Sequence, residues 1–240
     1  MSTFFNKNEK RWFATGEFQR ELDQGEDTIF KGFDLSGLNA KGSSLVGLNF
    51  DKADLSRADL SGARLEGSSF VLANLSQARL EKVDVDDTLF SGANLINANL
   101  NGLSGKEVCF VRANLERANL GGIQLVKADL GQAILDGCIG VKAGLNGASL
   151  FGVMCRAASL YVADLKGADL RRANLNFTKL DGSDLSGADL RGADLRTTQL
   201  SDVMLLGARY NQETLWPEGF DPEAAGAIFC DDSSFTKRRL

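Results

Sequence analysis

Large apolar residues recur at every fifth position of this chain from Phe30 to Leu215, and most of them are Leu. Ala commonly stands two residues before each apolar centre, as Ala53 precedes Leu55, and Asp or Asn commonly stands between them. Residues two apart on an extended segment point to the same side, so the Ala and the centre face inward. The period matches neither a helix nor a long strand. It predicts short extended segments joined by corners.

The corners are marked by Gly, which often stands two residues after a centre, as at Gly37, Gly62 and Gly187. A type II turn requires a positive φ angle at that position, and Gly adopts it without strain. Where a larger polar residue occupies the position, we expect other types of turn. These positions are Lys52, Arg57, Gln77, Arg112 and Lys127.

Phe residues indicate the length of one coil, because they recur at a spacing of twenty: Phe30, Phe50, Phe70, Phe90 and Phe110. One aromatic column every four pentapeptides predicts a four-sided coil, and a fixed internal period of this kind defines a solenoid. The expected fold class is an all-β solenoid, a quadrilateral β-helix of about nine four-sided coils that rise by about 4.8 Å each. Its hand is expected to be right, as in nearly all parallel crossovers.

The segments outside the repeat are expected to close its two ends, where a solenoid exposes unpaired backbone. A short helix is predicted within residues 6–24, because Asn6 and Glu9 can form a capping box there. It is expected to lie over the first coil. The chain divides into an N-terminal cap with this helix, the β-helix, a C-terminal cap and a flexible tail, at residues 1–29, 30–210, 211–230 and 231–240.

The C-terminal cap contains two aromatic residues, Trp216 and Phe220, that are expected to cover the last coil. The sequence Asp221-Pro222-Glu223 follows, and an N-cap residue, a Pro and an acid in this order are typical of a helix start.

Four centres hold small residues in place of Leu or Phe: Ala40, Gly105, Gly140 and Cys155. Larger residues stand two positions earlier at three of them, namely Leu38, Leu103 and Val153. Repacking at constant volume is therefore favoured over a functional loop. A bulge of the wall near Gly105 and Gly140 stays open as an alternative.

The repeated units Ala-Asp-Leu-Ser-Arg, Ala-Asp-Leu-Ser-Gly and Ala-Asn-Leu-Glu-Arg, sustained over about residues 30–210, resemble the A(D/N)LXX motif of the pentapeptide-repeat family. The resemblance implies a right-handed quadrilateral β-helix. The segment from Tyr210 to Gly226 further resembles a C-terminal cap of cyanobacterial and plastid members, which implies a regulatory or stress role in a photosynthetic bacterium. Some members of the family resemble B-form DNA in shape and charge, and shield or inhibit DNA gyrase.

Composition and charge exclude several classes of function. The 27 basic and 32 acidic residues give a net charge of −5, whereas a nucleic-acid-binding protein is normally basic. The chain has no His, which removes His-based acid–base catalysis and most zinc sites. We therefore expect no catalytic residue, cofactor or metal, and no enzyme. The four Cys lack paired spacing, and no secretory signal or membrane-length apolar stretch is visible, so a cytoplasmic location is expected.

One set of apolar residues occupies positions that should face water, in a region where the Ala-Asp-Leu consensus is weakest. The set comprises Ile134, Ile139, Val141, Phe151, Met154, Tyr161, Val162 and Phe177. A contiguous apolar patch marks a contact site, whereas a bulge could instead turn these residues inward. Nearby, Arg171 and Arg191 alternate with Asp169 and Asp189, and an exposed ion-pair ladder is favoured there over an anion site.

The function predicted from these features is that of a non-catalytic protein-interaction scaffold. Its partner is expected to be another protein rather than a small-molecule substrate, a nucleic acid or a membrane. The chain is expected to be a monomer or a weak homodimer. The alternative function is a DNA-mimicking modulator of a topoisomerase (gyrase), although the interleaved charges of this chain differ from the strongly acidic surface of such mimics.

Overall fold

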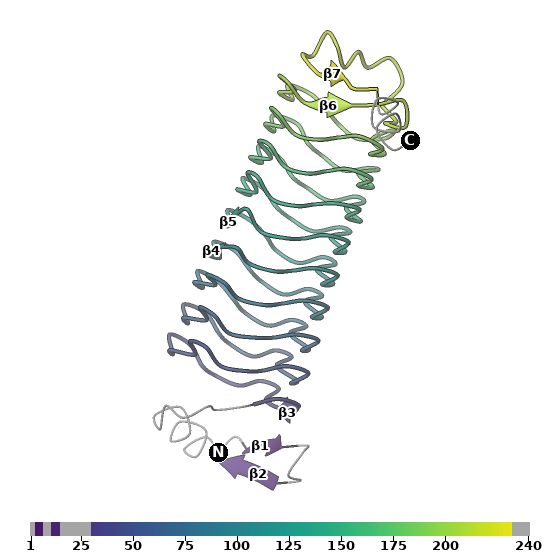
Figure 1. Cartoon of the computed structure of the whole chain (residues 1–240). Helices are drawn as coiled ribbons and strands as arrows, with labels where there is room; N and C mark the ends of the chain where they lie inside the picture. Colours follow the sequence, from purple (N-terminus) through teal and green to yellow (C-terminus); the bar gives the residue numbers. More distant parts are fainter. Residues whose placement is uncertain (1–2, 7–10, 15–29, 232–240) are drawn as a thin grey trace, which may run out of the picture.

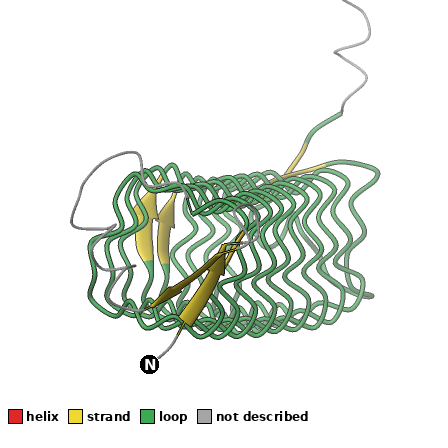
Figure 2. Ribbon diagram, turned by 90° about the horizontal axis from the view of Figure 1, so that it is seen from below, coloured by secondary structure: helices red, strands yellow, loops and turns green. Residues whose placement is uncertain are grey.

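The computed structural model describes residues 3–6, 11–14 and 30–231, and most of them form a rod of stacked coils (Figure 1). Neighbouring coils are joined by parallel bridges between residues twenty apart, from Asp34↔Asp54 near one end to Asp189↔Arg209 near the other. This constant separation confirms the predicted length of one coil. Seen along the rod, successive coils repeat the same outline (Figure 2).

Each wall of the rod is held by backbone hydrogen bonds between successive coils. Leu35 N donates to Asp54 O at 2.7 Å, and Asp54 N donates to Phe33 O at 2.8 Å. Most walls contain a single bridge residue, so few segments are long enough to form strands. The strands of the coils are β3 (Phe33–Asp34), β4 (Ser104–Lys106), β5 (Gln124–Val126), β6 (Arg209–Tyr210) and β7 (Ile228–Phe229). The pairs β4–β5 and β6–β7 are parallel.

Nearly all the corners have a positive φ at the same position, whether or not that position holds Gly. Gly62 has a φ of 64°, and Lys52 and Arg57 have φ values of 58° and 59°. The expectation of other turns at the larger polar residues is therefore wrong, and Gln77, Arg112 and Lys127 also have positive φ. The stack explains this result, because the corner amides bond alike to the next coil: Lys52 N donates to Val71 O, as Gly62 N does to Glu81 O, each at 2.9 Å.

The core is a column of apolar side chains inside the coils. Leu55 and Ala53 are both fully buried, which confirms that centres and Ala positions face inward. The Phe residues stack on one another, with ring centroids 4.9 Å apart between Phe50 and Phe70 and 4.8 Å apart between Phe90 and Phe110. Outside the walls, Asp and Asn side chains cap the corners, as where Ser56 N donates to Asp54 Oδ1 at 3.0 Å.

The N-terminal segment forms a hairpin rather than a helix where it is described. Strand β1 (Thr3–Asn6) pairs antiparallel with β2 (Arg11–Ala14) and with β3, so the order in the sheet is β2-β1-β3. The helix predicted within residues 6–24 is therefore wrong at Asn6 and at residues 11–14, which belong to strands. The other residues of that range lie outside the described residues. The physical reason is that β1 supplies hydrogen-bond partners to the free edge of the first coil, which a helix cannot do.

The small centres are accommodated without a bulge. Gly105 pairs with Leu125, and Gly140 N bonds to Ser159 O, so the twenty-residue register continues through both. The bulge considered for this wall is therefore wrong. Neighbouring side chains fill the space, because a Cβ atom on Gly105 would lie 2.8 Å from both Val85 Cγ2 and Val108 Cγ2. At Cys155 a cavity of about 10 Å³ remains, lined also by Leu135 and Val153.

The C-terminal segment extends the stack with altered register. Asp194 bridges to Leu215, one residue beyond the repeat spacing, and Arg209 pairs with Ile228 in the β6–β7 ladder, one residue short of it. Trp216 and Phe220 pack against the core, with ring centroids 5.3 Å apart.

The helix start predicted at Asp221-Pro222-Glu223 is wrong, because this stretch forms turns. Asp221 Oδ1 does accept a hydrogen bond from Ala224 N at 3.0 Å, as an N-cap residue would. The turns end as the chain enters β7, whose backbone pairs with β6 instead.

Candidate interaction surface

The apolar set predicted from the sequence lies on two neighbouring walls of the rod and at the corners that flank them, and we call it the apolar band: Ile134, Ile139, Val141, Phe151, Met154, Tyr161, Val162 and Phe177. Ile134 and Met154 are bridge partners on one wall, in the column of Asn114 and Asn174. Ile139 lies on the next wall, between Asn119 and Ser159. The remaining members lie at the corners that flank these two walls.

Exposure divides the apolar band into two halves. Phe177, Val162, Ile139 and Val141 are 64%, 55%, 53% and 36% exposed. Ile134, Phe151, Met154 and Tyr161 are half-buried. None belongs to the buried core, and the bridges of Ile134 and Ile139 keep the repeat register. The alternative in which a bulge turns these side chains inward is therefore wrong.

Two of the exposed residues are held in an unfavourable backbone conformation. Val162 and Phe177 have φ angles of 55° and 61°. A left-handed conformation costs an L-residue about 1–2 kcal/mol, and a β-branched or bulky side chain there is a true outlier. Gly or Asn at either corner would relieve this cost and would also remove apolar surface from water.

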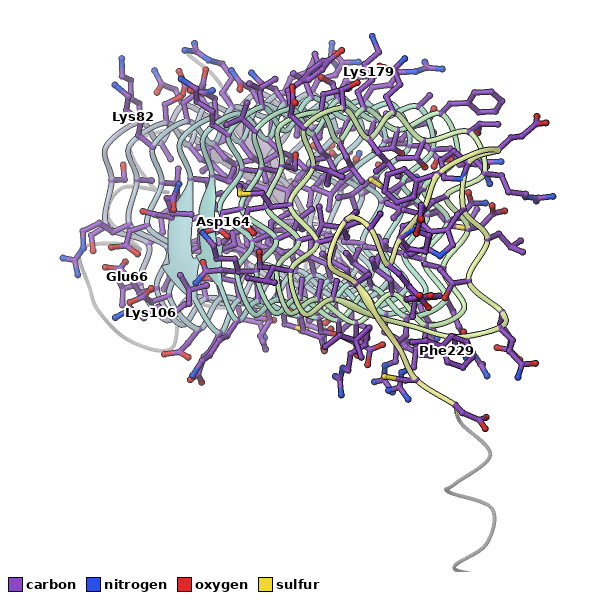
Figure 3. All side chains as sticks on the ribbon, turned by 90° about the horizontal axis from the view of Figure 1, so that it is seen from above. Glu66, Lys82, Lys106, Asp164, Lys179 and Phe229 are labelled. Atoms are coloured by element: carbon purple, nitrogen blue, oxygen red, sulfur yellow. The ribbon has the colours of Figure 1, made fainter. Side chains whose placement is uncertain are left out.

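Cations from neighbouring positions lie over the half-buried rings of the apolar band. The Arg171 and Arg172 guanidinium carbons lie 5.5 Å and 6.0 Å from the centroid of the Phe151 ring. Lys179 Nζ lies 5.8 Å from the Tyr161 ring centroid, and Figure 3 shows Lys179 on the outer surface of the rod. These contacts cover part of each ring and bring positive charge to the apolar band.

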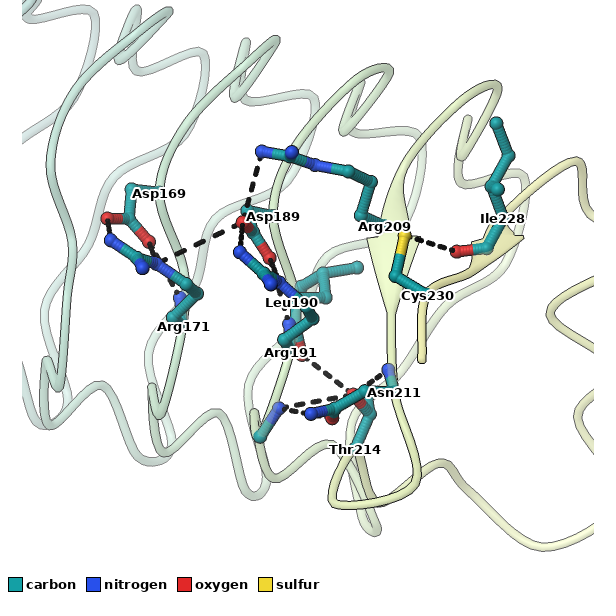
Figure 4. Close-up of polar contacts among 11 residues, drawn as sticks. Asp169, Arg171, Asp189, Leu190, Arg191, Arg209, Asn211, Thr214, Ile228 and Cys230 are labelled. Atoms are coloured by element: carbon teal, nitrogen blue, oxygen red, sulfur yellow. Dashed lines mark hydrogen bonds and ion pairs between the residues drawn. The ribbon is translucent and has the colours of Figure 1, made fainter. Parts of the chain in front are cut away.

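An ion-pair ladder, drawn in Figure 4, reaches the apolar band through Arg171, whose guanidinium group lies over the Phe151 ring. Arg171 Nη2 lies 2.7 Å from Asp169 Oδ2, and Arg191 Nη2 lies 2.7 Å from Asp189 Oδ2. Arg209 Nη2 lies 3.1 Å and Arg171 Nε lies 3.9 Å from Asp189 Oδ2, so the Asp189 carboxylate pairs with three guanidinium groups. This arrangement confirms an ion-pair ladder at these residues.

The ladder stabilises the charged form of its carboxylates. The hydrogen bond from Arg171 lowers the pKa of Asp169. Burial favours a higher pKa at Asp189, but the hydrogen bonds from Arg191 outweigh it, and that pKa is lowered as well. On the wall that also carries Met154, Arg196 lowers the pKa of Asp194 to about 2. These pairs keep most of the local Arg charge neutralised.

Sequence reasoning missed a second exposed apolar group at the C-terminal end of the rod. Its members are Met204, Leu206, Leu215, Ile228 and Phe229, of which Leu206 is 75% exposed. The signal was present in the sequence, because Met204 and Leu206 occupy outward positions of the repeat. The register change after Asp194 is what brings Leu215 to an outward position, and the repeat alone does not predict it.

Residues 3–6, 11–14 and 30–231 contain no group of three His, Cys, Asp or Glu side chains suited to hold a metal ion. Within the same residues, no helix has the length and apolar character needed to cross a membrane.

The stacked four-sided coils, with residues twenty apart in parallel register, define a β-solenoid protein. A family model described as pentapeptide repeats matches the chain in eight copies, over residues 34–71, 73–104, 109–150, 148–187, 158–196 and 178–209. The chain belongs to the pentapeptide-repeat family. Proteins of this family adopt a right-handed quadrilateral β-helix, and the matched model describes a repeat rather than a catalytic domain.

Several solved structures are similar to this chain. HetL, a pentapeptide repeat protein involved in heterocyst differentiation regulation from the cyanobacterium Nostoc sp. strain PCC 7120, is 26% identical, with 78% of this chain and 91% of HetL covered and a TM-score of 0.39. Another pentapeptide repeat protein from Nostoc PCC 7120 is 32% identical, with 51% of this chain and 84% of its own covered and a TM-score of 0.34.

Full-length QnrB1, a plasmid-mediated fluoroquinolone resistance protein, is 20% identical, with 74% of this chain and 90% of QnrB1 covered and a TM-score of 0.55. At this identity the likeness shows a common fold alone. No curated protein sequence matches the chain significantly.

Proposed function

We propose that this protein is a non-catalytic interaction scaffold that binds another protein through the apolar band. The observation that carries the proposal is the pair Val162 and Phe177, because both are large apolar side chains, 55% and 64% exposed, at neighbouring corners of the apolar band. Their positive φ is the ordinary conformation of the corners, which Leu72 outside the apolar band also has, so the support comes from the gathering of exposed apolar side chains in one part of the surface. The neighbouring Ile139 and Val141 extend the exposed apolar surface.

The rod is suited to such a role because its backbone is continuously cross-linked. Hydrogen bonds join coil to coil from Phe30 N to Asn49 O through to Cys230 N to Tyr210 O. The apolar band therefore has little conformational freedom to lose on binding, which lowers the entropic cost of forming an interface. A regulatory role for the scaffold belongs to the same proposal and rests on the resemblance of the segment from Tyr210 to Gly226 to a C-terminal cap of cyanobacterial and plastid family members.

The proposal also includes the finer features predicted from the sequence. We propose about nine coils between residues 30 and 210. Segments 1–29 and 211–230 are proposed as caps, and 231–240 as a tail. Bridges at twenty-residue spacing from Asp34 to Arg209 support the number of coils. A monomer or a weak homodimer in the cytoplasm is expected, and sedimentation and cell fractionation would test these two points.

Charge substitution at the strained corners would test the interaction surface. Val162→Asp and Phe177→Asp introduce charge while relieving backbone strain, since Asp tolerates positive φ better than Val or Phe. The tagged double variant is expected to lose the partner that the unmodified chain retains from an extract of its native host. Val46→Asp is the matched control, because Val46 is also exposed, at 43%, but lies outside the apolar band.

Retention of the same partner by a folded double variant would contradict this proposal. Circular dichroism and thermal unfolding of all three proteins would show that each variant keeps its fold. Loss of the partner from the Val46→Asp control as well would also contradict it, because the effect would then not be specific to the apolar band.

The alternative function, a DNA-mimicking modulator of gyrase, has less support. Arg and Asp alternate along the ladder of Figure 4, as where Arg171 pairs with Asp169, whereas a DNA mimic needs a continuous acidic surface. The likeness to QnrB1 supports the fold and does not decide the activity. A gyrase supercoiling assay separates the two functions, because inhibition or protection at stoichiometric amounts would favour the alternative.

A further inference from the structure

We propose that the partner contacts the apolar band with a protein segment that carries carboxylate side chains beside apolar ones. This inference rests on the proposed function and specifies the chemistry of the partner. It follows from the cations around the apolar band that the protein itself leaves unneutralised.

Three exposed cations border the apolar band without a carboxylate at ion-pair distance among the described residues: Lys142, Arg172 and Lys179. Arg172 approaches the Phe151 ring, and Lys179 approaches the Tyr161 ring. Lys142 occupies the same corner column as Val162, twenty residues earlier in the repeat. Each cation thus lies beside a different part of the apolar surface.

The neighbouring Arg side chains behave differently. Arg156 binds Asp136 with Nη2 and Oδ2 2.5 Å apart, and Arg196 binds Asp194 with the same atoms 2.8 Å apart. These pairs neutralise charge within the wall, so the positive excess comes from the three unpaired cations. One carboxylate opposes it, that of Asp181, which lies in the corner column of Tyr161 one coil further on and forms no ion pair with any described residue. Its Oδ1 atom accepts a hydrogen bond from Ser201 N at 3.2 Å.

The apolar band therefore has a local positive excess on a chain whose net charge is −5. Complementary charge at the rim of an interface speeds association and selects among partners. An acidic and apolar segment could cover Ile139 and Phe177 while its carboxylates contact Arg172 and Lys179. A basic segment would meet repulsion at the same positions.

A protein segment fits the apolar band better than a nucleic acid does. Single-stranded nucleic acids bind to tracks of basic side chains with aromatic rings on which the bases stack. Here the exposed part of the apolar band is largely aliphatic, comprising Ile139, Val141 and Val162 beside one ring, Phe177. Three separated cations do not form a continuous track for a phosphate backbone.

A displayed library of random 12-residue peptides tests this chemistry before the partner is identified. Selection against the full chain is expected to enrich peptides that combine Asp or Glu with aliphatic or aromatic residues. A synthetic copy of the most enriched peptide would then be titrated by fluorescence anisotropy. Arg172→Glu with Lys179→Glu is expected to weaken its binding by about tenfold or more, since rim charges turn from attractive to repulsive. The control Lys52→Glu reverses a charge at a corner far from the apolar band.

The outcomes separate this inference from the proposed function. Basic or uncharged peptides that lose binding in the Phe177→Asp variant would overturn the acidic chemistry but leave the apolar band as an interaction surface. Peptides that bind equally well to the Val162→Asp and Phe177→Asp double variant, or no enrichment at all, would overturn both. Tighter binding of a labelled single-stranded oligonucleotide or of phosphatidylserine vesicles to the apolar band would also overturn the inference.

Discussion

At the residue scale, the corners impose a backbone conformation that their side chains do not favour. Val162 is the clearest case, because it is β-branched and has a φ of 55°. We expect Val162→Gly to raise the free energy of unfolding by about 1 kcal/mol, since Gly adopts this conformation without strain. Urea denaturation would measure the change. A loss of stability would contradict the assignment of strain.

A matched control for this prediction exists at Gly187. Its φ is 69°, and a Cβ atom placed on it would meet nothing within 4 Å. Gly187→Val would therefore report the backbone cost alone, without a steric clash. We expect it to lower the free energy of unfolding by about 1–2 kcal/mol, opposite in sign to Val162→Gly.

Small centres in the core give a second prediction at this scale. A Cβ atom on Gly105 would lie 2.9 Å from the backbone carbon of Val85, whereas on Gly140 it would meet Leu160 Cδ2 at 2.7 Å. The Leu160 side chain can shift, but the backbone at Val85 cannot do so without disturbing the wall. Gly105→Ala should cost about 1–3 kcal/mol and more than Gly140→Ala. Equal losses in thermal unfolding would count against this interpretation of the packing.

The sequence predicted which residues face the core and the positive φ of the Gly corners, but it did not predict the same φ at corners that hold larger polar residues. The alternation of Ala53, Asp54 and Leu55 is enough to assign inward and outward positions, because each short segment is extended. The positive φ at Lys52 could not be predicted in the same way, since a Lys residue considered without its neighbouring coil disfavours positive φ. There the bond from Lys52 N to Val71 O in the next coil fixes the turn, and a single segment does not reveal that contact.

At the element scale, the N-terminal hairpin protects one end of the stack. Strand β1 lies between β2 and β3, so its backbone groups face a neighbour on both sides. Phe5 is paired with both Trp12 and Asp34. We expect Phe5→Pro to break this pairing, because Pro cannot donate within a central strand. The free edge of the first coil should then promote association between rods.

Light scattering as a function of protein concentration would measure that association. Phe5→Ala serves as the control, since it keeps the backbone donor. Association in both variants alike would indicate that backbone pairing of β1 is not what protects the edge. The failed helix prediction has the same origin: the apparent capping box at Asn6 is local, whereas the pairing of Asn6 with Phe33 joins distant parts of the chain.

At the scale of the whole molecule, the rod combines a regular scaffold with an irregular surface. The period from Phe30 to Leu215 was sufficient to predict the coil, because each repeat contacts its neighbours in the same way. The outward placement of residues such as Ile134 and Tyr161 was also predicted, from their positions in the repeat. The cations over its rings were not, because side-chain positions such as that of Lys179 near Tyr161 depend on rotamers rather than on spacing.

The outer ion pairs make the stability of the whole rod sensitive to acid. Hydrogen bonds from Arg196 lower the pKa of Asp194 to about 2, and Arg171 lowers that of Asp169. A carboxyl whose pKa is lower in the folded state stabilises the fold fully above its unfolded pKa of about 4, and the stabilisation is lost as the pH falls through the folded value. The free energy of unfolding should therefore decline from about pH 4 toward about pH 2. No His is present to add a transition near neutral pH.

Urea denaturation at a series of pH values would measure this decline. Arg196→Gln should remove the contribution of Asp194, so the variant should be less stable than the parent at pH 6 and should differ less from it near pH 2. Arg117→Gln is the control, since Arg117 is exposed and its pair with Glu116 is longer, at 3.4 Å. A parent protein with constant stability between pH 4 and pH 2 would show that these exposed pairs are screened by solvent, and the walls would then owe their stability to backbone pairing and the apolar core alone.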